Sequence, residues 1–533
     1  MNRKLIKVKK LINTLYSEKS PSSLSEEIGN AYSESISKEQ KKELGQFFTP
    51  AKVASFMAGL FDVNFQKKKI KILDPGCGAL SLSCALVERL INQNKNIKKI
   101  EIDAFDTDPL LDTIVTNVSN ILKNWGKEKG VEIDINYSSS DFLLSHKTHL
   151  KKDLNTPIYD LVVSNPPYFK IKKEDARISV FNSPLQGQQN IYSLFLLGAS
   201  KLLKKQGQLV FIVPRSFTSG VYFQSFQKLF LKEIDIEYFH LFNSRTDGFK
   251  KDKVLQENII LKAIPKNKTQ SSKIKISSSQ GINDLESLKE KEFPIELLFK
   301  KIGKLNIIHL PVNELEEEAM NLFSTWTHNL GSFGMKVSTG PVVPFRCKSH
   351  LKHRKPKNSN YAPLIWMHNC LKMKLSFPNK KTDKEAWIVD NMKSNSKTIK
   401  NQNYIFLRRF SSKDDNAKLV ATPHLEEYFD HNKLGIENHL NYLYKPEGIL
   451  DPEEVFGLSV LYNSSIFDAY IRSLSGNTQV SATELNALPL PPMDAIKKIG
   501  TQYLSLNGSG IKEIDNIVNR TFELSQKHTQ WKK

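Results

Sequence analysis

The feature that most constrains the fold is a regular alternation of short apolar strands with amphipathic helices between residues 70 and 214. Each strand ends in a polar or glycine-containing turn, and the helices that follow are about 10–15 residues long. Because parallel strands need crossover connections of this kind, the pattern predicts an α/β fold with a doubly wound, Rossmann-like sheet. The expected strands are residues 70–73, 100–105, 133–137, 161–163 and 208–214.

The chain has 533 residues, which is too long for a single hydrophobic core, so we expect two or three domains. Residues 265–279 are rich in Lys, Ser and Thr, which indicates a linker or an exposed edge, and the strand–helix alternation stops there. The expected division is an N-terminal helical segment over 1–40, the α/β domain over 41–264, a second domain of α+β character over 265–495, and a helical tail over 496–533.

Residues capable of ligand binding stand at the ends of the predicted strands, where doubly wound sheets bind their ligands. Asp74, Gly76 and Gly78 form a turn after the first strand, and its glycines let the backbone approach a ligand closely. A full dinucleotide fingerprint is absent because Ser81 occupies the third glycine position, so a purely structural turn stays an alternative. Asp106 ends the next strand, where an acidic residue can accept hydrogen bonds from both hydroxyls of a ribose.

Two further aspartates need to be weighed in the same region. Asp108 precedes Pro109 and is more typical of a helix start than of a ligand contact. Asp141 ends the third strand and could accept a hydrogen bond from the exocyclic amine of an adenine ring, which Phe142 would cover. An N-cap role for Asp141 is an equal alternative.

The stretch Asn165, Pro166, Pro167 and Tyr168 follows the apolar strand 161–163. Each proline fixes its own φ and biases the residue before it away from the α region, so the backbone here is stiff and extended. Such a segment can point an amide side chain and a bare carbonyl at a single substrate group. The alternative is a rigid loop after a strand.

A helix is predicted to begin near residue 50, upstream of the first strand. Thr49 is a plausible N-cap with Pro50 at the first helical position, and Val53, Phe56 and Met57 form one apolar face.

The charge of the chain favours a polyanionic partner. Lys and Arg number 77 against 56 Asp and Glu, which gives a net charge of +21 and a pI near 9.4. This balance indicates nucleic acid before a membrane surface, and no apolar run approaches the ~18 residues of a membrane span. The four cysteines show no zinc-ligand spacing, so we expect no metal site and a reduced, cytoplasmic protein.

Together these motifs resemble the N6-adenine DNA methyltransferases of the gamma order, in which the cofactor motifs precede the Asn-Pro-Pro-Tyr motif and the recognition domain comes last. The resemblance runs from residue 45, at the start of a Gly-Gln-Phe-Phe-Thr-Pro motif, to about residue 260. It implies an S-adenosylmethionine-dependent catalytic domain over 41–264 and a DNA target-recognition domain over 265–495. Double-stranded DNA would be the substrate, and the target adenine would be flipped out of the duplex.

The resemblance also implies a role for each motif residue. Phe48 and Thr49 would contact the methionine end of the cofactor, and Asp106 its ribose. The residues implied to bind the cofactor are Phe48, Thr49, Asp74, Gly76, Gly78, Asp106, Asp141, Phe142 and Phe195. Those implied in catalysis are Asn165, Pro166, Pro167, Tyr168 and Phe249. Tyr168 and Phe249 would stack on the flipped adenine, although Phe249 could instead be a loop aromatic that packs on the sheet.

The closer resemblance is to the BsuBI/PstI-type branch of this family. Its markers are residues 242–245 leading to 254–260, then 337–343, 407–410 and 476–485. The branch implies a bacterial enzyme that protects DNA from a cognate restriction endonuclease, without an obligate protein partner. Members of the branch modify adenine in CTGCAG.

Candidate DNA contacts lie in the second half of the chain. Arg346, Arg408 and Arg409 could read guanine or bind phosphate, and surface solubility or an internal salt bridge is an equal alternative. The basic cluster 348–355 is better suited to phosphates than to bases, with a solvated face as its alternative.

Other functions stay open on the sequence. Related methyltransferases act on adenine in RNA or on a glutamine amide in release factors, and a specificity subunit could have lost its chemistry. The long basic C-terminal part favours DNA, and the presence of Asp106, Asp141 and Asn165 argues against a silent subunit. We find no nuclease constellation that would indicate a fused restriction enzyme.

Overall fold

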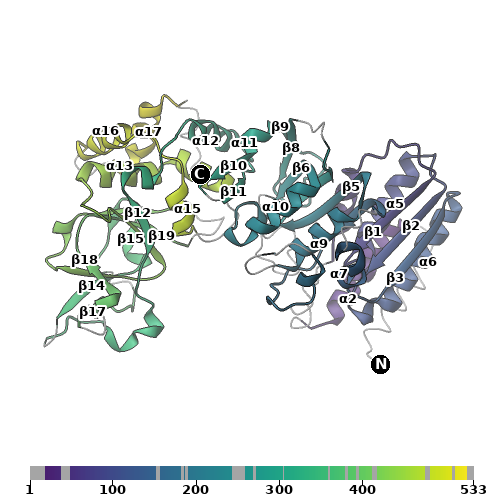
Figure 1. Ribbon diagram of the computed structural model, residues 1–533, viewed down its shortest axis with the longest axis horizontal. Coiled ribbons are helices and arrows are strands. Elements are labelled where there is room, and N and C mark those ends of the chain that lie inside the picture. The colour runs from purple at the N-terminus through teal and green to yellow at the C-terminus, as the bar shows by residue number, and fades with distance from the viewer. Residues whose placement is uncertain are drawn as a thin grey trace. The chain divides into compact units, whose positions relative to one another are not determined.

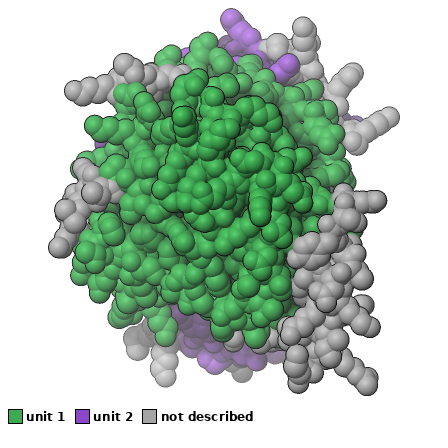
Figure 2. Space-filling model, turned by 90° about the vertical axis from the view of Figure 1, so that its right-hand side faces the viewer, with its two compact units in different colours: residues 1–298 green, residues 299–533 purple. Residues whose placement is uncertain are grey.

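The computed structural model describes residues 19–37, 48–151, 157–181, 185, 190–242, 258–267, 272–303, 305–357, 360–378, 382–391, 395–410, 417–474, 480–506 and 510–524. The chain divides into two compact units, residues 1–298 and 299–533, which Figure 2 distinguishes by colour. Each unit is described by itself.

The first unit is built on a nine-stranded sheet (Figure 1). Its strands are β1 (Lys69–Pro75), β2 (Lys99–Phe105), β3 (Glu132–Ser138), β4 (Tyr159–Ser164), β5 (Leu203–Pro214), β6 (Ile234–Phe242), β7 (Asn258–Pro265), β8 (Lys273–Ser279) and β9 (Lys289–Pro294). The strand order is β3-β2-β1-β4-β5-β7-β6-β8-β9, and the first five strands are parallel. β7 runs antiparallel between β5 and β6. The predicted doubly wound, Rossmann-like sheet is confirmed.

Helices cover both faces of this sheet. They are α2 (Pro21–Ser35), α4 (Ala51–Gly59), α5 (Ser81–Gln93), α6 (Asp112–Glu128), α7 (Phe142–Ser145), α8 (Lys147–Lys151), α9 (Ile191–Lys201), α10 (Gln224–Glu233) and α11 (Ile295–Leu298). Alternate strand residues such as Ile72, Val163 and Ile212 share one core with α2, α4, α5 and α6. Their neighbours Val162 and Phe211 are equally buried but lie outside that core, on the side where α9 contacts β5. Both faces of β4 and of residues 207–214 of β5 are buried, as expected at the centre of a parallel sheet.

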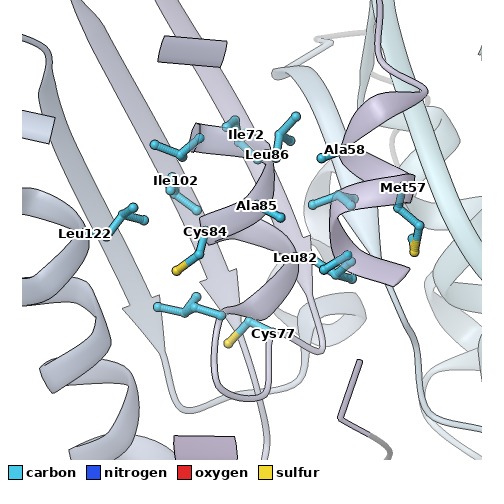
Figure 3. Close-up of a cluster of buried hydrophobic side chains, with 14 of the residues drawn as sticks. Met57, Ala58, Ile72, Cys77, Leu82, Cys84, Ala85, Leu86, Ile102 and Leu122 are labelled. Carbon is cyan, nitrogen blue, oxygen red and sulfur yellow. The ribbon is translucent and has the colours of Figure 1, made fainter. Parts of the chain in front are cut away.

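Figure 3 shows part of the first core, where α5 packs between the strands and α4. Cys84, Ala85 and Leu86 of α5 are at most 3% exposed. They lie with Ile72 of β1, Ile102 of β2, Met57 and Ala58 of α4, and Leu122 of α6 (Figure 3). This packing fixes the start of α5, and with it the turn that links α5 to β1.

The structure corrects the predicted boundary at residue 264. β8 pairs with β6 and β9 pairs with β8, so the sheet continues to residue 294 and the first unit ends at residue 298. Lys273 and Lys275 of β8 are exposed, and so are all four Lys and Glu residues at 289–292 of the edge strand β9. This polar composition, which is common at sheet edges, conceals both strands in the sequence. The N-terminal helix α2 also belongs to this unit, since Leu24, Ile28 and Tyr32 are buried in its core.

The second unit combines small sheets with a helical layer. Its strands are β10 (Phe299–Ile302), β11 (Leu305–Ile308), β12 (Lys336–Thr339), β13 (Leu351–Lys352), β14 (Tyr361–Ile365), β15 (Cys370–Leu371), β16 (Lys374–Leu375), β17 (Trp387–Val389), β18 (Thr398–Lys400), β19 (Tyr404–Arg408), β20 (Ala421–His424), β21 (Lys433–Ile436) and β22 (Leu440–Tyr444). Its helices are α12 (Glu314–Ser324), α13 (Pro452–Tyr462), α14 (Ser465–Leu474), α15 (Ala482–Ala487), α16 (Met493–Leu504) and α17 (Ile514–Phe522). The two larger sheets have the orders β12-β22-β19-β20 and β13-β17-β14-β21-β18.

The second unit contains both helices and small sheets, so its predicted α+β character is confirmed. The expected helical tail is not separate, because α16 packs along α13 and α17 packs on α16. Among the described residues, no helix is both long enough and apolar enough to cross a bilayer.

Glycines let α13 and α16 pack at close range, and this contact can be tested. A Cβ added at Gly500 would overlap the carbonyl oxygen of Glu453. We expect Gly500→Ala to lower the free energy of unfolding by about 1–3 kcal/mol, because rigid backbone stands in the way. Urea denaturation followed by tryptophan fluorescence measures this, since Trp326, Trp366 and Trp387 all lie in the second unit.

Gly59 provides the matched control for this substitution. It ends α4 and has nothing within 4 Å of an added Cβ. Gly59→Ala should therefore leave the unfolding free energy unchanged or raise it by up to about 1 kcal/mol. Equal losses for the two variants would contradict the packing argument.

Candidate active site

The candidate site is assembled where β1 and β4 end side by side. The two strands are parallel neighbours, with Leu73 opposite Val162. Beyond the last pair, the Ser164 hydroxyl donates a hydrogen bond of 2.5 Å to the Pro75 carbonyl, which ties the two strand ends together. The turn after β1 and the Asn-Pro-Pro segment after β4 therefore leave the sheet at the same place.

The glycine turn lies directly against the segment after β4. Gly76 has a φ of +77°, which favours glycine, and an added Cβ would lie 3.7 Å from Pro167 Cδ and 3.8 Å from both Asn165 O and Phe195 Cε1. Gly78 also has a positive φ, of +51°. The structure thus brings together four of the predicted site residues from three separate segments of the chain.

Phe48 closes the outer side of this turn. A Cβ at Gly78 would lie 3.2 Å from Phe48 Cε1, and one at Gly29 of α2 would lie 3.1 Å from Phe48 Cδ1. Phe48 also meets Tyr32 edge-on, with 5.8 Å between ring centroids. The N-terminal segment therefore forms a wall of the candidate cofactor site.

Asp106 is held by backbone amides at the end of β2. The N–H of Gly78 donates to Asp106 Oδ2 at 3.0 Å, and that of Asp108 donates to Oδ1 at 3.1 Å. Burial raises the pKa of the Asp106 carboxyl to about 6, although these two hydrogen bonds oppose the shift. Asp106 thus lies against the glycine turn, as a ribose-binding acid would.

Asp108 performs a different task, in agreement with its expected place at a helix start. It is 3% exposed and caps the short 3₁₀ helix Pro109–Leu111. Its Oδ1 accepts a hydrogen bond from the Leu110 N–H. The Tyr32 hydroxyl donates to its other oxygen.

Asp74 is a fully buried carboxyl at the end of β1. Ser83 donates a hydrogen bond of 2.6 Å to its Oδ2, whereas Oδ1 has no hydrogen-bond partner among the described residues. Burial raises the pKa of Asp74 to about 7, with a smaller contribution from the negative charge of Asp106. An unpaired buried carboxylate oxygen is costly, so this site is suited to a cationic or hydrogen-bond-donating ligand.

Asp141 occupies the N-cap of α7, where its Oδ1 accepts the Leu144 N–H at 3.0 Å. The N-cap alternative is therefore realised, and Oδ2 lies 3.6 Å from Arg177 Nη1. Phe142 is 1% exposed, and its ring centroid lies 5.4 Å from that of Phe195. These rings connect the predicted adenine-binding pair to the Gly76 turn.

The Asn165 side chain is fixed at both ends. Its Nδ2 donates to Thr49 Oγ1 at 3.1 Å, and its Oδ1 accepts from the Tyr168 hydroxyl at 2.6 Å. The predicted N-cap role of Thr49 is wrong, because Pro50 occupies the N-cap and no side chain caps α4. Thr49 instead faces the Asn-Pro-Pro segment, across 116 residues of sequence.

Tyr168 is buried, with 8% of its side chain exposed. Its hydroxyl can also donate to the Ile212 carbonyl of β5 at 2.9 Å, and its ring meets Tyr192 of α9 edge-on at 6.2 Å. Burial raises the pKa of Tyr168 well above its usual value, so the phenol stays a neutral donor. Tyr192 was not among the predicted site residues, although Phe195 of the same helix was.

Four predicted site residues remain, one outside the described residues and three in the second unit. Phe249 falls outside the described residues, as does the start of the Gly-Gln-Phe-Phe-Thr-Pro motif at 45–47. The three candidate DNA-binding arginines lie in the second unit. Arg346 is exposed, Arg408 Nε donates to the Cys370 carbonyl at 2.7 Å, and Arg409 Nη1 donates to the Asn438 carbonyl at 3.2 Å. None of the three forms an ion pair within the described part of the chain.

Comparison with known proteins identifies the family. Residues 77–249 match the model of the Eco57I restriction-modification methylase family. The type II methyltransferase M.PstI of Providencia stuartii is 31% identical over 506 residues, which are 94% of this chain and 97% of that protein. The type II methyltransferase M.BsuBI of Bacillus subtilis is 31% identical over 484 residues, 89% of this chain and 93% of that protein.

A third relative, the type II methyltransferase M.AccI of Acinetobacter calcoaceticus, is 26% identical over 49% of this chain and 43% of its own length. The likeness to M.PstI and M.BsuBI, in contrast, spans both compact units. The chain therefore belongs to the M.PstI and M.BsuBI family of type II restriction-modification methyltransferases, enzymes that methylate DNA with S-adenosylmethionine.

Proposed function

We propose that the protein is a site-specific DNA adenine-N6 methyltransferase that flips its target adenine out of the duplex and methylates the exocyclic amine. The observation that carries this proposal is the Asn165 amide, which is held in a fixed orientation beside the glycine turn. A pairing with a separate restriction endonuclease, which the methylation would block, is part of the proposal.

The residues around the glycine turn fit S-adenosylmethionine. Asp74 offers a buried oxygen without a partner to the ammonium of the ligand, and Asp106 offers a carboxylate to its ribose hydroxyls. Phe48, Thr49, Gly76 and Gly78 line the same turn, with Asp141, Phe142 and Phe195 proposed at the adenine end. When bound, the group supplies a methyl on a positively charged sulfur.

The amine of the target base needs help because its lone pair is delocalised into the purine ring. The Asn165 Oδ1 and the Pro166 carbonyl can each accept one of its N–H groups, which directs the lone pair outward and stabilises the positive charge that develops on nitrogen. Both acceptors are neutral, and no proton needs to leave before attack. Pro167 holds the backbone of this segment extended.

Thr49 supports this role by setting the orientation of the amide. Because its hydroxyl accepts from Nδ2, the Oδ1 of Asn165 is turned toward Tyr168 rather than toward α4. Oδ1 can then receive the amine when the phenol proton of Tyr168 turns to its second acceptor, the Ile212 carbonyl.

The remaining predicted roles belong to the same proposal. Tyr168 and Phe249 would hold the flipped adenine by stacking. In the second unit, Arg346 is the best placed of the three arginines for DNA, because Arg408 and Arg409 already bond to backbone carbonyls.

Transfer of labelled methyl from S-adenosylmethionine to duplex DNA, mapped to the modified base, tests this function. We expect N6-methyladenine at one short sequence, with CTGCAG as the first candidate. Label on RNA or on a protein glutamine, or on cytosine, would overturn the proposal. Asn165→Ala should lower transfer on the order of 10²–10³-fold or more, while duplex binding stays close to the wild-type level. Loss of both would indicate that Asn165 has a structural role instead.

The role of Thr49 is tested by Thr49→Val, which keeps the shape of the side chain and removes the acceptor. We expect kcat to fall about tenfold, the value of about one hydrogen bond, with little change in affinity for S-adenosylmethionine. Thr49→Ser keeps the hydroxyl and should retain most of the activity. A loss of cofactor affinity with an unchanged kcat would contradict the positioning role.

The pKa of Asp106 predicts a pH dependence of cofactor binding. Its carboxyl has a pKa of about 6 and is ionised above that pH, so it accepts from ribose hydroxyls at neutral pH and loses this capacity as the pH falls. Affinity for S-adenosylmethionine should weaken by up to about tenfold per pH unit below 6.

Calorimetric titration between pH 5 and pH 8 measures this dependence. Asp106→Asn should bind about 10- to 100-fold more weakly at pH 8 and show a shallower fall below pH 6, because the titrating group is gone. The same pH profile in the variant and in the wild type would assign the dependence to another residue.

A further inference from the structure

A single phenylalanine of the second unit stands out into solvent. Phe345 lies in the 3₁₀ turn Pro344–Arg346, between β12 and β13, and its side chain is 78% exposed. This is the largest exposure of any large apolar side chain among the described residues. Covering this ring with a partner would be favourable, because its apolar surface would be removed from water.

The exposure is not a consequence of a loose loop. Val342 and Cys347 flank the turn and are buried in a small core with Leu351. Val342 N–H donates to the Ile436 carbonyl at 3.0 Å, Arg346 N–H to the Val343 carbonyl at 2.9 Å, and Cys347 N–H to the Pro344 carbonyl at 3.2 Å. The backbone on both sides is anchored, so the ring is presented in a fixed place.

The approach to this turn is equally constrained. Gly340 packs so closely on the backbone of β21 that an added Cβ would overlap the carbonyl oxygens of Ile436 and Glu437. Such packing leaves the turn little freedom to fold its ring inward.

The chain segment around Phe345 is basic, although burial raises the pKa of the Cys347 thiol and the carboxylate of Glu385 lies close enough to add to that rise. Between residues 336 and 357 the chain contains no Asp or Glu, and its Lys and Arg residues are Lys336, Arg346, Lys348, Lys352, Arg354, Lys355 and Lys357. Of these seven, none forms an ion pair among the described residues. The Arg346 guanidinium lies over the Phe345 ring, 5.4 Å from its centroid. This surface is complementary to a polyanion with apolar, flat groups.

We propose that the Phe345 turn, residues 344–346, is a contact for duplex DNA in which the Phe345 ring packs against bases and Arg346 supplies the charge beside it. Apolar side chains pack on thymine methyl groups or enter between base steps, and a fixed turn does so without an ordering cost. The inference rests on the proposed function only in taking duplex DNA as the substrate. It requires neither methyl transfer nor adenine specificity.

Binding of the full-length protein to a fluorescein-labelled 30-base-pair duplex carrying CTGCAG, without methyl donor, tests this contact. Anisotropy is measured across a range of salt concentrations. We expect Phe345→Ala to weaken binding at least tenfold and to leave the slope of affinity against salt unchanged, because no charge is removed. Phe345→Leu should recover most of the loss. Arg346→Ala should weaken binding and also reduce the salt slope by about one.

Tyr428 provides the matched control. It is an aromatic residue of the same unit, 46% exposed in a 3₁₀ turn, but it follows Glu426 and Glu427. Tyr428→Ala should bind the duplex like the wild-type protein. Wild-type binding by Phe345→Ala, an equal loss in both variants, or a Phe345-dependent loss only on vesicles of anionic phospholipid would overturn the proposal. A protein that binds through Phe345 but transfers no methyl would refute the proposed function and leave this contact intact.

Discussion

The parallel pairing of β1 with β4 determines the geometry of the whole site. It brings the glycine turn and the Asn-Pro-Pro segment to one edge of the sheet, and the hydrogen bond from Ser164 to Pro75 locks the two strand ends together. Gly76 then lies against Asn165 and Pro167. A direct methyl transfer requires the donor and the acceptor to be held a few ångströms apart, and this pairing supplies that proximity from rigid strands.

Charged and neutral groups lie on different sides of the candidate site, at the carboxyl ends of the parallel strands. On the side of β1 and β2, Asp74 and Asp106 are carboxyls whose pKa values are raised by burial, and a cationic ligand would favour their ionised forms. On the side of β4, Asn165 and Pro166 offer neutral dipoles only. Under the proposed function, the carboxylates would face a ligand that arrives positively charged, and the dipoles would face an amine that becomes positive during the reaction.

Short apolar runs that alternate with helices were sufficient to predict the parallel strands, because the central strands of such a sheet are buried on both faces. The motif residues followed because they end those strands. Prediction from the sequence failed where a polar composition conceals structure, as in β8 and the edge strand β9. It also failed for Thr49, whose partner Asn165 lies 116 residues away. An N-cap pattern is local, whereas a side-chain partner from another segment is set by tertiary packing. At Asp141 the local pattern was right, because one carboxylate oxygen caps α7 while the other faces Arg177.

The second unit shows why charge alone selects DNA contacts poorly. Arg408 and Arg409 look as suitable as Arg346 in the sequence, but their guanidinium groups donate to the carbonyls of Cys370 and Asn438. Breaking these bonds to reach DNA would offset part of the gain, since a donor would be left unpaired. Arg346 has no such cost, because it already stands in solvent over the Phe345 ring. A candidate recognition residue is thus distinguished by an anchored backbone and by how few internal hydrogen bonds its side chain would lose on binding DNA.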